Sequence, residues 1–236
     1  MITNNFIALV ITFGLALTWL RLNNFAAQKG WISSDLSRKI IHIGTGPIFV
    51  TCWLLFNDQP VARYLATLVP LAITFQFVLV GFGFIRDPAA VQSMSRSGDR
   101  REILHGPLYY GIVFVVLTIL YWRNSPIGIV ALMLVCGGDG LADIFGRRMG
   151  KTKLPWNRKK TWVGSISMFL GGWLFSTLLL AIFFAFGMLP GNLFTNYLPV
   201  VTLIEFAASI VESLPLQDID NLTIAITAVL LGHAFF

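Results

Sequence analysis

Long apolar stretches separated by short polar segments dominate the chain. Eight such stretches lie approximately at residues 6–20, 40–56, 64–85, 108–122, 126–145, 162–189, 197–211 and 222–236. They lack the alternation of apolar and polar positions that is typical of membrane β-barrel strands, and a bilayer otherwise admits only helices. The pattern therefore predicts an all-α, polytopic transmembrane bundle of about eight spans. Seven spans is the alternative, because several stretches are shorter than the ~20 residues of an ideal span.

The composition is also that of a membrane protein. Hydrophobic residues make up 56% of the 236 residues and charged residues only 12%, whereas about a quarter of a soluble domain is charged. No long linker, low-complexity tract or internal repeat interrupts the pattern, so a single integral membrane domain over residues 1–236 is expected. Cys52 and Cys136 both fall inside apolar stretches and are assigned no chemistry.

The distribution of positive charge predicts an orientation. Fifteen of the 17 Lys and Arg residues lie in alternate loops within residues 21–39, 86–101 and 147–160, and the opposite loops hold only Arg63 and Arg123. Under the positive-inside rule this places the basic loops in the cytoplasm and both termini on the other side. The net charge of +6 is thus explained by topology, and a nucleic-acid partner is not expected.

Two acidic residues stand at the end of the fifth stretch. At about 100° per residue, Asp139, Asp143, Gly146 and Gly150 share one narrow helical arc. An acid deep in a membrane helix costs ~2.5–3.5 kcal/mol on insertion scales, so this pair indicates a compensating cation, a metal or an aqueous cavity.

A purely structural interpretation of the same arc remains open. Either acid could form an ion pair with Arg147 or Arg148, while the small residues support close helix packing. The seven basic residues between 147 and 160 likewise fit two roles. They could keep the loop on the cytoplasmic side or bind anionic lipid headgroups, or they could neutralise charge on phosphate oxygens. Acids that hold a divalent ion, next to cations that offset phosphate charge, favour phosphoryl transfer.

The segment 146–152 resembles a phosphate-binding P-loop but does not qualify as one. Only three residues separate Gly146 from Gly150 where that loop needs four, and an apolar span precedes it in place of a strand. A soluble nucleotide triphosphatase is therefore excluded.

Other polar residues gather at the same predicted membrane level. His42 opens the second span and Glu102 precedes the fourth. Taken alone, His42 is more typical of a packing histidine, and the structural alternative for Glu102 is a pair with a neighbouring arginine. Glu212, Asp220 and Asn221 flank the turn between the last two spans, where the alternative role is a helix cap. Glu205 lies inside the seventh span and is a site candidate with no assigned partner.

At these residues the sequence resembles the polyprenol and phytol kinase family, which is related to dolichol kinases and more distantly to CTP-using phosphatidate cytidylyltransferases. The resemblance is strongest to the phytol kinase branch of cyanobacteria and plastids. The matching segments run from the second span to the last and comprise Ser37-Arg38-Lys39 with His42, Glu102 with 106–110, 139–150, Lys160-Thr161 with Gly164-Ser165, and 212–215 with Asp220-Asn221.

The resemblance implies transfer of the γ-phosphate of CTP to the hydroxyl of a membrane-dissolved prenyl alcohol, with Mg²⁺ as cofactor. Phytol is the expected substrate, with geranylgeraniol or farnesol as alternatives, and the product would feed phytol salvage and tocopherol synthesis. Membrane lipid is the remaining partner. No transit peptide precedes the first span, so the expected location is a bacterial membrane of cyanobacterial type, inner or thylakoid, with the site facing the cytoplasm.

Residue roles follow from combining this resemblance with the charge pattern. Asp139 and Asp143 are expected to bind Mg²⁺. The catalytic set adds Lys160, His42, Glu102 and Glu212. The base is not chosen among His42, Glu102, Glu212 and Asp220. The nucleotide-binding set consists of Arg38, Lys39, Gly146, Arg147, Arg148, Gly150, Lys153, Thr161, Gly164, Asp220 and Asn221.

Two departures from the family pattern affect these roles. Val163 precedes Gly164 where dolichol kinases carry a glutamate, which favours the phytol branch and removes a candidate carboxylate. Ile219 stands where the family often has a second acid before Asp220, so no role that needs adjacent acids is assigned there. A cytidylyltransferase acting on a lipid phosphate and a non-enzymatic lipid transporter are the alternative functions.

Overall fold

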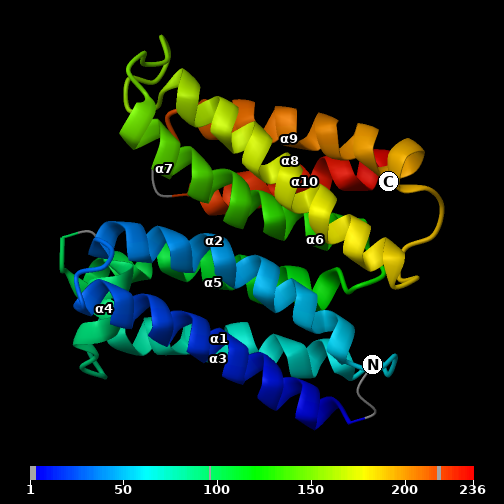
Figure 1. The fold of residues 1–236 in the computed structure, drawn as a ribbon, viewed down its shortest axis with the longest axis horizontal. Coiled ribbons are helices and arrows are strands. Elements are labelled where there is room, and N and C mark those ends of the chain that lie inside the picture. Colours follow the sequence, from blue (N-terminus) through cyan, green and yellow to red (C-terminus); the bar gives the residue numbers. More distant parts are fainter. Residues whose placement is uncertain (1–3, 96, 217–218) are drawn as a thin grey trace. The chain divides into compact units, whose positions relative to one another are not determined.

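The computed structural model describes residues 4–95, 97–216 and 219–236. All secondary-structure elements within these ranges are helices (Figure 1). Within these ranges a single isolated antiparallel bridge joins Lys153 and Thr161. The all-α prediction is confirmed. Arg96, one of the basic loop residues counted above, lies outside the described ranges. The chain divides into two compact units, residues 1–119 and 120–236, which are described separately. The expectation of a single domain stays a prediction.

The described residues of the first unit form five α-helices and two short 3₁₀ turns. In chain order these are α1 (Asn5–Gln28), α2 (Ser34–Cys52), η1 (Trp53–Leu55), α3 (Ala62–Phe82), α4 (Pro88–Met94), η2 (Arg100–Leu104) and α5 (Gly106–Leu120). Helix α1 packs against α2 and α3, and α4 packs against α2. The short α4 was not predicted from hydropathy. It forms because Asp87 caps the amide of Ala90 and Pro88 occupies the first turn.

The second unit is built around one long helical segment. This segment joins α6 (Pro126–Met133), the π-helical turn η3 (Leu134–Gly138) and α7 (Asp139–Met149). The remaining elements are α8 (Trp162–Ala185), the π-helical turn η4 (Leu193–Tyr197), α9 (Leu198–Ser213) and α10 (Asp220–Phe235). Helix α8 packs along α6, η3 and α7, α9 packs between α8 and α10, and α10 returns to α6. Residues 129–136 are fully buried as a result.

Glycines allow α8 to approach the π-helical turn closely. A Cβ atom on Gly137 would overlap the ring of Phe175, and one on Gly171 would overlap the carbonyl oxygen of Gly137. Small residues at such crossings let helix backbones pack tightly inside a membrane. The π turn directly precedes Asp139, and single π turns inside α-helices are frequently found at functional sites.

Helices occur at all eight predicted stretches. In the part of the chain that the structure describes, six helical segments are long and apolar enough to cross a membrane: Asn5–Gln28, Ala62–Phe82, Arg100–Leu120, Pro126–Met149, Trp162–Ala185 and Leu193–Ser213. The other two stretches form α2 and α10. Helix α2 begins at Ser34 because Ser33 caps it, so its first turns are polar, and α10 has only 16 residues.

One face of α8 presents a continuous apolar stripe to the outside. Ile166, Leu170 and Leu174 are each 56% exposed and Leu178 is 53% exposed. Their four-residue spacing keeps them on one side of the helix. A stripe of this length would be a liability in water, whereas lipid tails solvate it without cost.

Candidate active site

A well-defined loop connects α7 to α8 and carries most of the basic residues of the second unit. The amide of Leu154 donates to the carbonyl of Lys160 (3.1 Å), and the amide of Trp162 donates to the carbonyl of Thr152 (3.2 Å). These bonds flank the bridge between Lys153 and Thr161 and close the loop into a short hairpin. Leu154 is buried beneath it, with 1% of its surface exposed. The backbone is therefore fixed although the loop is strongly charged.

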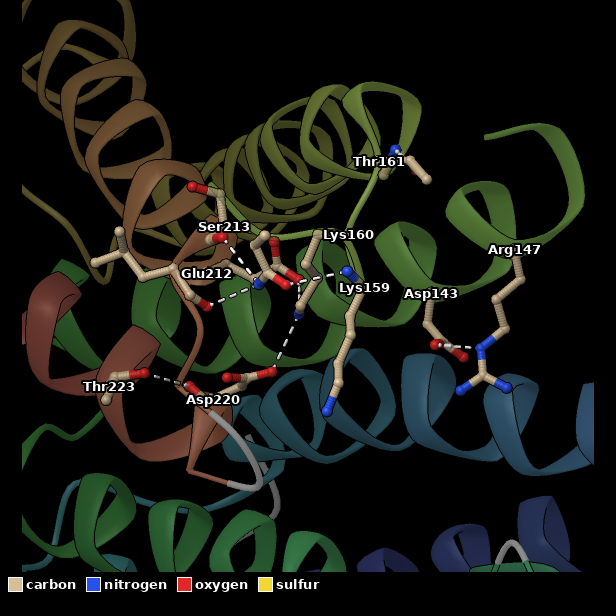
Figure 2. Close-up of polar contacts among 12 residues, drawn as sticks. Asp143, Arg147, Lys159, Lys160, Thr161, Glu212, Ser213, Asp220 and Thr223 are labelled. Carbon is tan, nitrogen blue, oxygen red and sulfur yellow. Dashed lines mark hydrogen bonds and ion pairs between the residues drawn. The ribbon is translucent and has the colours of Figure 1, made fainter. Parts of the chain in front are cut away.

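Lys160 points from the end of this loop into a group of carboxylates. Its Nζ donates to Oε1 of Glu212, in the last turn of α9, and to Oδ2 of Asp220 at 3.1 Å, in the first turn of α10 (Figure 2). The Glu212 side chain is only 3% exposed, whereas those of Lys160 and Asp220 are 27% and 25% exposed. The ammonium thus joins the end of α9 to the start of α10.

The electrostatic environment keeps this ammonium charged. Burial acts to lower the pKa of Lys160, but the negative charges of Glu212, Asp139 and Asp220 outweigh it and raise the pKa above its ordinary value of 10.5. Asp139 is therefore also within the electrostatic reach of Lys160. Asp220 in addition lies at the N-terminus of α10, where the helix dipole favours a negative charge.

Asp143 takes part in a different interaction. Its Oδ1 accepts from Nε of Arg147, four residues later on α7, at 2.7 Å (Figure 2). The Arg147 side chain is 50% exposed and that of Asp143 is 20% exposed. The ion pair given as the structural alternative is therefore present for Asp143. The charge of Asp139, in contrast, acts on Lys160.

The predicted nucleotide-binding glycines pack α7 against the start of α8. A Cβ atom on Gly146 would meet Gly164 and Thr161, and one on Gly150 would overlap the side chain of Thr161. Thr161 itself caps α8, since its Oγ1 accepts from the amide of Gly164 at 3.1 Å. Gly146, Gly150, Thr161 and Gly164 therefore lie together, and they fill the space between the backbones of α7 and α8.

The remaining predicted residues of this unit lie at its periphery. Arg148 and Lys153 are exposed, as are the other loop cations except Lys160. Asn221 is the second residue of α10 and is partly buried.

Four predicted residues lie in the first unit, which is described here by itself. Arg38 donates to the carbonyl of Ser95 (2.7 Å) and pairs with Asp35. Lys39 is partly buried on α2. The ring of His42 stacks on that of Tyr110 with centroids 4.4 Å apart.

Glu102 completes the predicted set in the first unit. Its Oε2 accepts from the amide of Ser97 at 3.1 Å, and it belongs to the 3₁₀ turn η2. This contact shapes the connection between α4 and α5.

Glu205 lies on the same face of α9 as Glu212, two turns earlier. It is fully buried, and its Oε1 accepts from Oγ of Ser176 on α8 at 2.8 Å. Within the described ranges its other oxygen, Oε2, has no hydrogen-bond partner. Gly172 makes room for this carboxyl group, since a Cβ atom there would overlap it.

Sequence reasoning missed the residues that hold the loop in place. Nε1 of Trp156 donates to Oγ of Ser213 at 3.0 Å, and Nδ2 of Asn157 donates to the carbonyls of Ser213 (3.1 Å) and Leu214 (3.2 Å). The only available signal was Asn157 before a run of basic residues, because asparagine favours the first position of a turn.

The chemistry of this site is that of a charged group at the end of an apolar bundle. The carboxylates of Glu212 and Asp220 bind one retained ammonium, on which the charge of Asp139 also acts. Exposed cations precede Lys160 on the same loop. Such an arrangement can bind a polyanion, accept a proton from a hydroxyl group and supply oxygen ligands to a hard cation.

Known proteins with similar sequences identify the family of this chain. No protein-family model and no solved structure matches the chain. The chain is 39% identical over 230 residues to a probable chloroplast phytol kinase of Triticum aestivum, covering 97% of this chain and 76% of the relative. It is 39% identical to phytol kinase 1 of Arabidopsis thaliana over 211 residues, and 41% identical to the farnesol kinase of the same plant over 213 residues. Each of these two alignments covers 89% of this chain, with 69% and 68% of the respective relative. The chain therefore belongs to the phytol and farnesol kinase family.

Proposed function

We propose that the chain is a membrane prenol kinase that uses CTP to phosphorylate phytol, or a related alcohol such as farnesol or geranylgeraniol. The observation that carries this proposal is the identity of 39–41%, over most of the chain, with both phytol and farnesol kinases. The product would be a prenyl phosphate for phytol salvage and tocopherol synthesis.

The acceptor is an alcohol with a long apolar tail. Such a tail can remain between the helices or in the adjoining lipid while its hydroxyl reaches the polar end of the second unit. This avoids the cost of moving the tail into water, ~0.8 kcal/mol for each CH₂ group. The apolar outer stripe on α8 is consistent with a bundle that is solvated by such chains.

Phosphoryl transfer then requires one bond to form and one to break. The alcohol oxygen attacks the γ-phosphorus, the bond from that phosphorus to the β,γ-bridging oxygen breaks, and CDP leaves. The hydroxyl proton passes to a carboxylate. Asp220 is better suited than Glu212 to accept it, because its side chain is 25% exposed and that of Glu212 only 3%.

Lys160 would stabilise negative charge during this step. Its ammonium is already held by Glu212 and Asp220, so little reorganisation is needed when charge develops on the phosphate oxygens. Arg147, Arg148 and Lys153 are exposed on the same unit and would contribute attraction for the triphosphate.

The two acids of α7 are oxygen ligands of the kind that Mg²⁺ prefers. Among the described residues no group of three His, Cys, Asp or Glu is arranged to hold a metal. Mg²⁺ in kinases is bound by one or two carboxylates together with the substrate phosphates, so a complete protein cage is not required. Asp139 and Asp143 would supply these carboxylates, and the bound ion would neutralise charge on the β- and γ-phosphates.

The proposed orientation follows the distribution of basic residues. Eight spans with both termini on the far side would place the loops within 21–39, 86–101 and 147–160 in the cytoplasm, where the nucleotide is available. Lys160, with its partners Glu212 and Asp220, would then face the cytoplasm.

Product analysis tests the proposal. Purified protein is incubated with Mg²⁺ and either CTP or ATP, using phytol, geranylgeraniol, farnesol and phosphatidate in turn. A prenyl phosphate and CDP, formed faster with CTP than with ATP, are expected. A CDP-lipid with pyrophosphate would instead identify a cytidylyltransferase, and an absence of nucleotide turnover would favour a lipid transporter or binding protein.

A further inference from the structure

Asn157 uses its whole side-chain amide to join two parts of the second unit. Its Nδ2 donates to the carbonyls of Ser213 and Leu214, at 3.1 and 3.2 Å, where α9 ends. Its Oδ1 accepts from the amide of Lys159 at 3.1 Å. The residue is only 8% exposed, so these contacts are shielded from competition with water.

The backbone of Asn157 in turn fixes the position of Lys160. The amide of Lys160 donates to the carbonyl of Asn157 at 3.0 Å, which closes a four-residue turn. The carbonyl of Lys160 accepts from the amide of Leu154 at 3.1 Å. Both sides of the Lys160 peptide are therefore bound, and the side chain leaves the loop in a defined direction toward Glu212 and Asp220.

Electrostatics alone would not keep this loop in place. Five cations lie between 151 and 160, and their mutual repulsion favours an extended loop. The unpaired carbonyls at a helix C-terminus are strong acceptors for an N–H donor. An uncharged amide satisfies these carbonyls while also accepting from the turn, which neither aspartate nor lysine can do.

We propose that Asn157 is a positioning residue, which holds the ammonium of Lys160 at the Glu212 and Asp220 carboxylates by tying the turn of the loop to the end of α9. The catalytic part of this inference rests on the proposed function, whereas the link from Asn157 to Lys160 does not. Loss of the link would let Lys160 swing out among the other exposed cations.

Amine labelling measures the position of Lys160 without any substrate. The full-length protein in detergent is treated briefly with an acetylating reagent at about pH 8, and acetylation of each lysine is measured by mass spectrometry. A paired, charged ammonium reacts slowly because only the neutral amine is nucleophilic. Asn157→Ala and Asn157→Asp are expected to raise Lys160 acetylation about fivefold or more relative to Lys151 and Lys159.

Two further variants separate positioning from general damage to the fold. Trp156→Phe removes one hydrogen bond to Ser213 but leaves the Asn157 turn intact, so Lys160 labelling should stay at the wild-type level. Asn157→Ser keeps a hydroxyl acceptor for the amide of Lys159 and is the milder substitute if the other two fail to fold. Its Lys160 labelling should lie between wild type and Asn157→Ala.

Turnover of the prenyl alcohol provides the second measurement. Asn157→Ala should lower kcat about 10- to 100-fold, as expected for a displaced catalytic group, while KM for the alcohol stays near wild type. Unchanged Lys160 labelling in both Asn157 variants would overturn the proposal, as would equal labelling changes in Trp156→Phe. A labelling increase with wild-type kcat would overturn the catalytic part of the proposal. If wild-type protein phosphorylates no alcohol but labelling responds as expected, the proposed function fails and the link between Asn157 and Lys160 stands.

Discussion

The ammonium of Lys160 reaches the carboxylate of Glu212 across 52 residues of sequence, from the end of the loop before α8 to the last turn of α9. Glu212 is almost completely buried and Lys160 retains some contact with solvent. The lysine is therefore the partner that makes a charged group tolerable at this position.

Replacing Lys160 should destabilise the protein. Lys160→Met removes the cation from a buried carboxylate, and breaking such a pair costs about 3 kcal/mol, toward the low end for buried pairs because the lysine is partly solvated. Thermal or denaturant unfolding in detergent measures the loss.

Two comparisons control this prediction. Lys159→Met neutralises an exposed neighbour and should change stability by less than about 0.5 kcal/mol. Adding Glu212→Gln to Lys160→Met should recover part of the loss, because no charge then remains buried at Glu212. A double variant less stable than Lys160→Met would rule out the assigned pairing.

The stabilisation by Lys160 should also depend on pH in a defined direction. The folded-state pKa of Lys160 is raised above its ordinary value of 10.5. A group of this kind contributes its full stabilisation below its unfolded pKa and loses it as the pH rises through the folded pKa. The stability difference between wild type and Lys160→Met should therefore be constant from neutral pH to about pH 10 and shrink above it. Unfolding measured across this range would contradict the prediction if the difference vanished near pH 8.

The helices were predictable from sequence because each apolar stretch is long and a membrane permits little else. An ion pair of an α7 acid with Arg147 or Arg148 was the structural alternative to metal binding, and the pair of Asp143 with Arg147 forms because residues four apart on a helix are neighbours. The partners of Lys160 were not assignable, because they depend on which helix ends meet at one end of the second unit. Asn157 was missed because its contacts are to backbone carbonyls, which carry no sequence signal.

The π-helical turn before Asp139 was also unforeseen. Gly137 and Gly138 indicate close packing, but a change in helical period depends on the approach of α8 at Phe175 and Met168. Because the approach of α8 is a tertiary contact, the local sequence did not predict the π-helical turn.

Substitutions at Asp139 and Asp143 should separate catalysis from stability. Asp139→Asn and Asp143→Asn are nearly isosteric, and each should lower turnover on the order of 100-fold, or about 2.7 kcal/mol of barrier. Asp143→Asn breaks only a half-exposed ion pair, so its stability should fall by less than about 1 kcal/mol. Mg²⁺ titrations of turnover, paired with unfolding curves, measure both effects. Wild-type turnover in both variants at every Mg²⁺ concentration would remove these acids from the mechanism.

The proposed orientation predicts that two loops are labelled from one side of the membrane and a third loop from the other. Cysteines introduced at Ser97 and Thr152, both exposed, should react with a membrane-impermeant thiol reagent from the cytoplasmic side. A cysteine at the exposed Asn192 should react only from the other side. The buried Cys52 and Cys136 should contribute little background. Labelling of all three new cysteines from one side would contradict the eight-span arrangement.

The close approach of Gly172 to Glu205 should make this glycine hard to replace. A Cβ atom at residue 172 would overlap the carboxyl group, which is fully buried between α8 and α9 and accepts from Ser176 at 2.8 Å. Gly172→Ala must therefore displace Glu205 or separate the helices, and overpacking of this kind costs about 1–3 kcal/mol.

Gly14→Ala is the matched control, because nothing lies within 4 Å of a Cβ atom there and the helix gains a better helix former. Unfolding in detergent should show Gly14→Ala equal to or more stable than wild type and Gly172→Ala less stable. Adding Glu205→Ala, which empties the overlapped space, should reduce the cost of Gly172→Ala, and an undiminished cost would show that the glycine is required for a different contact.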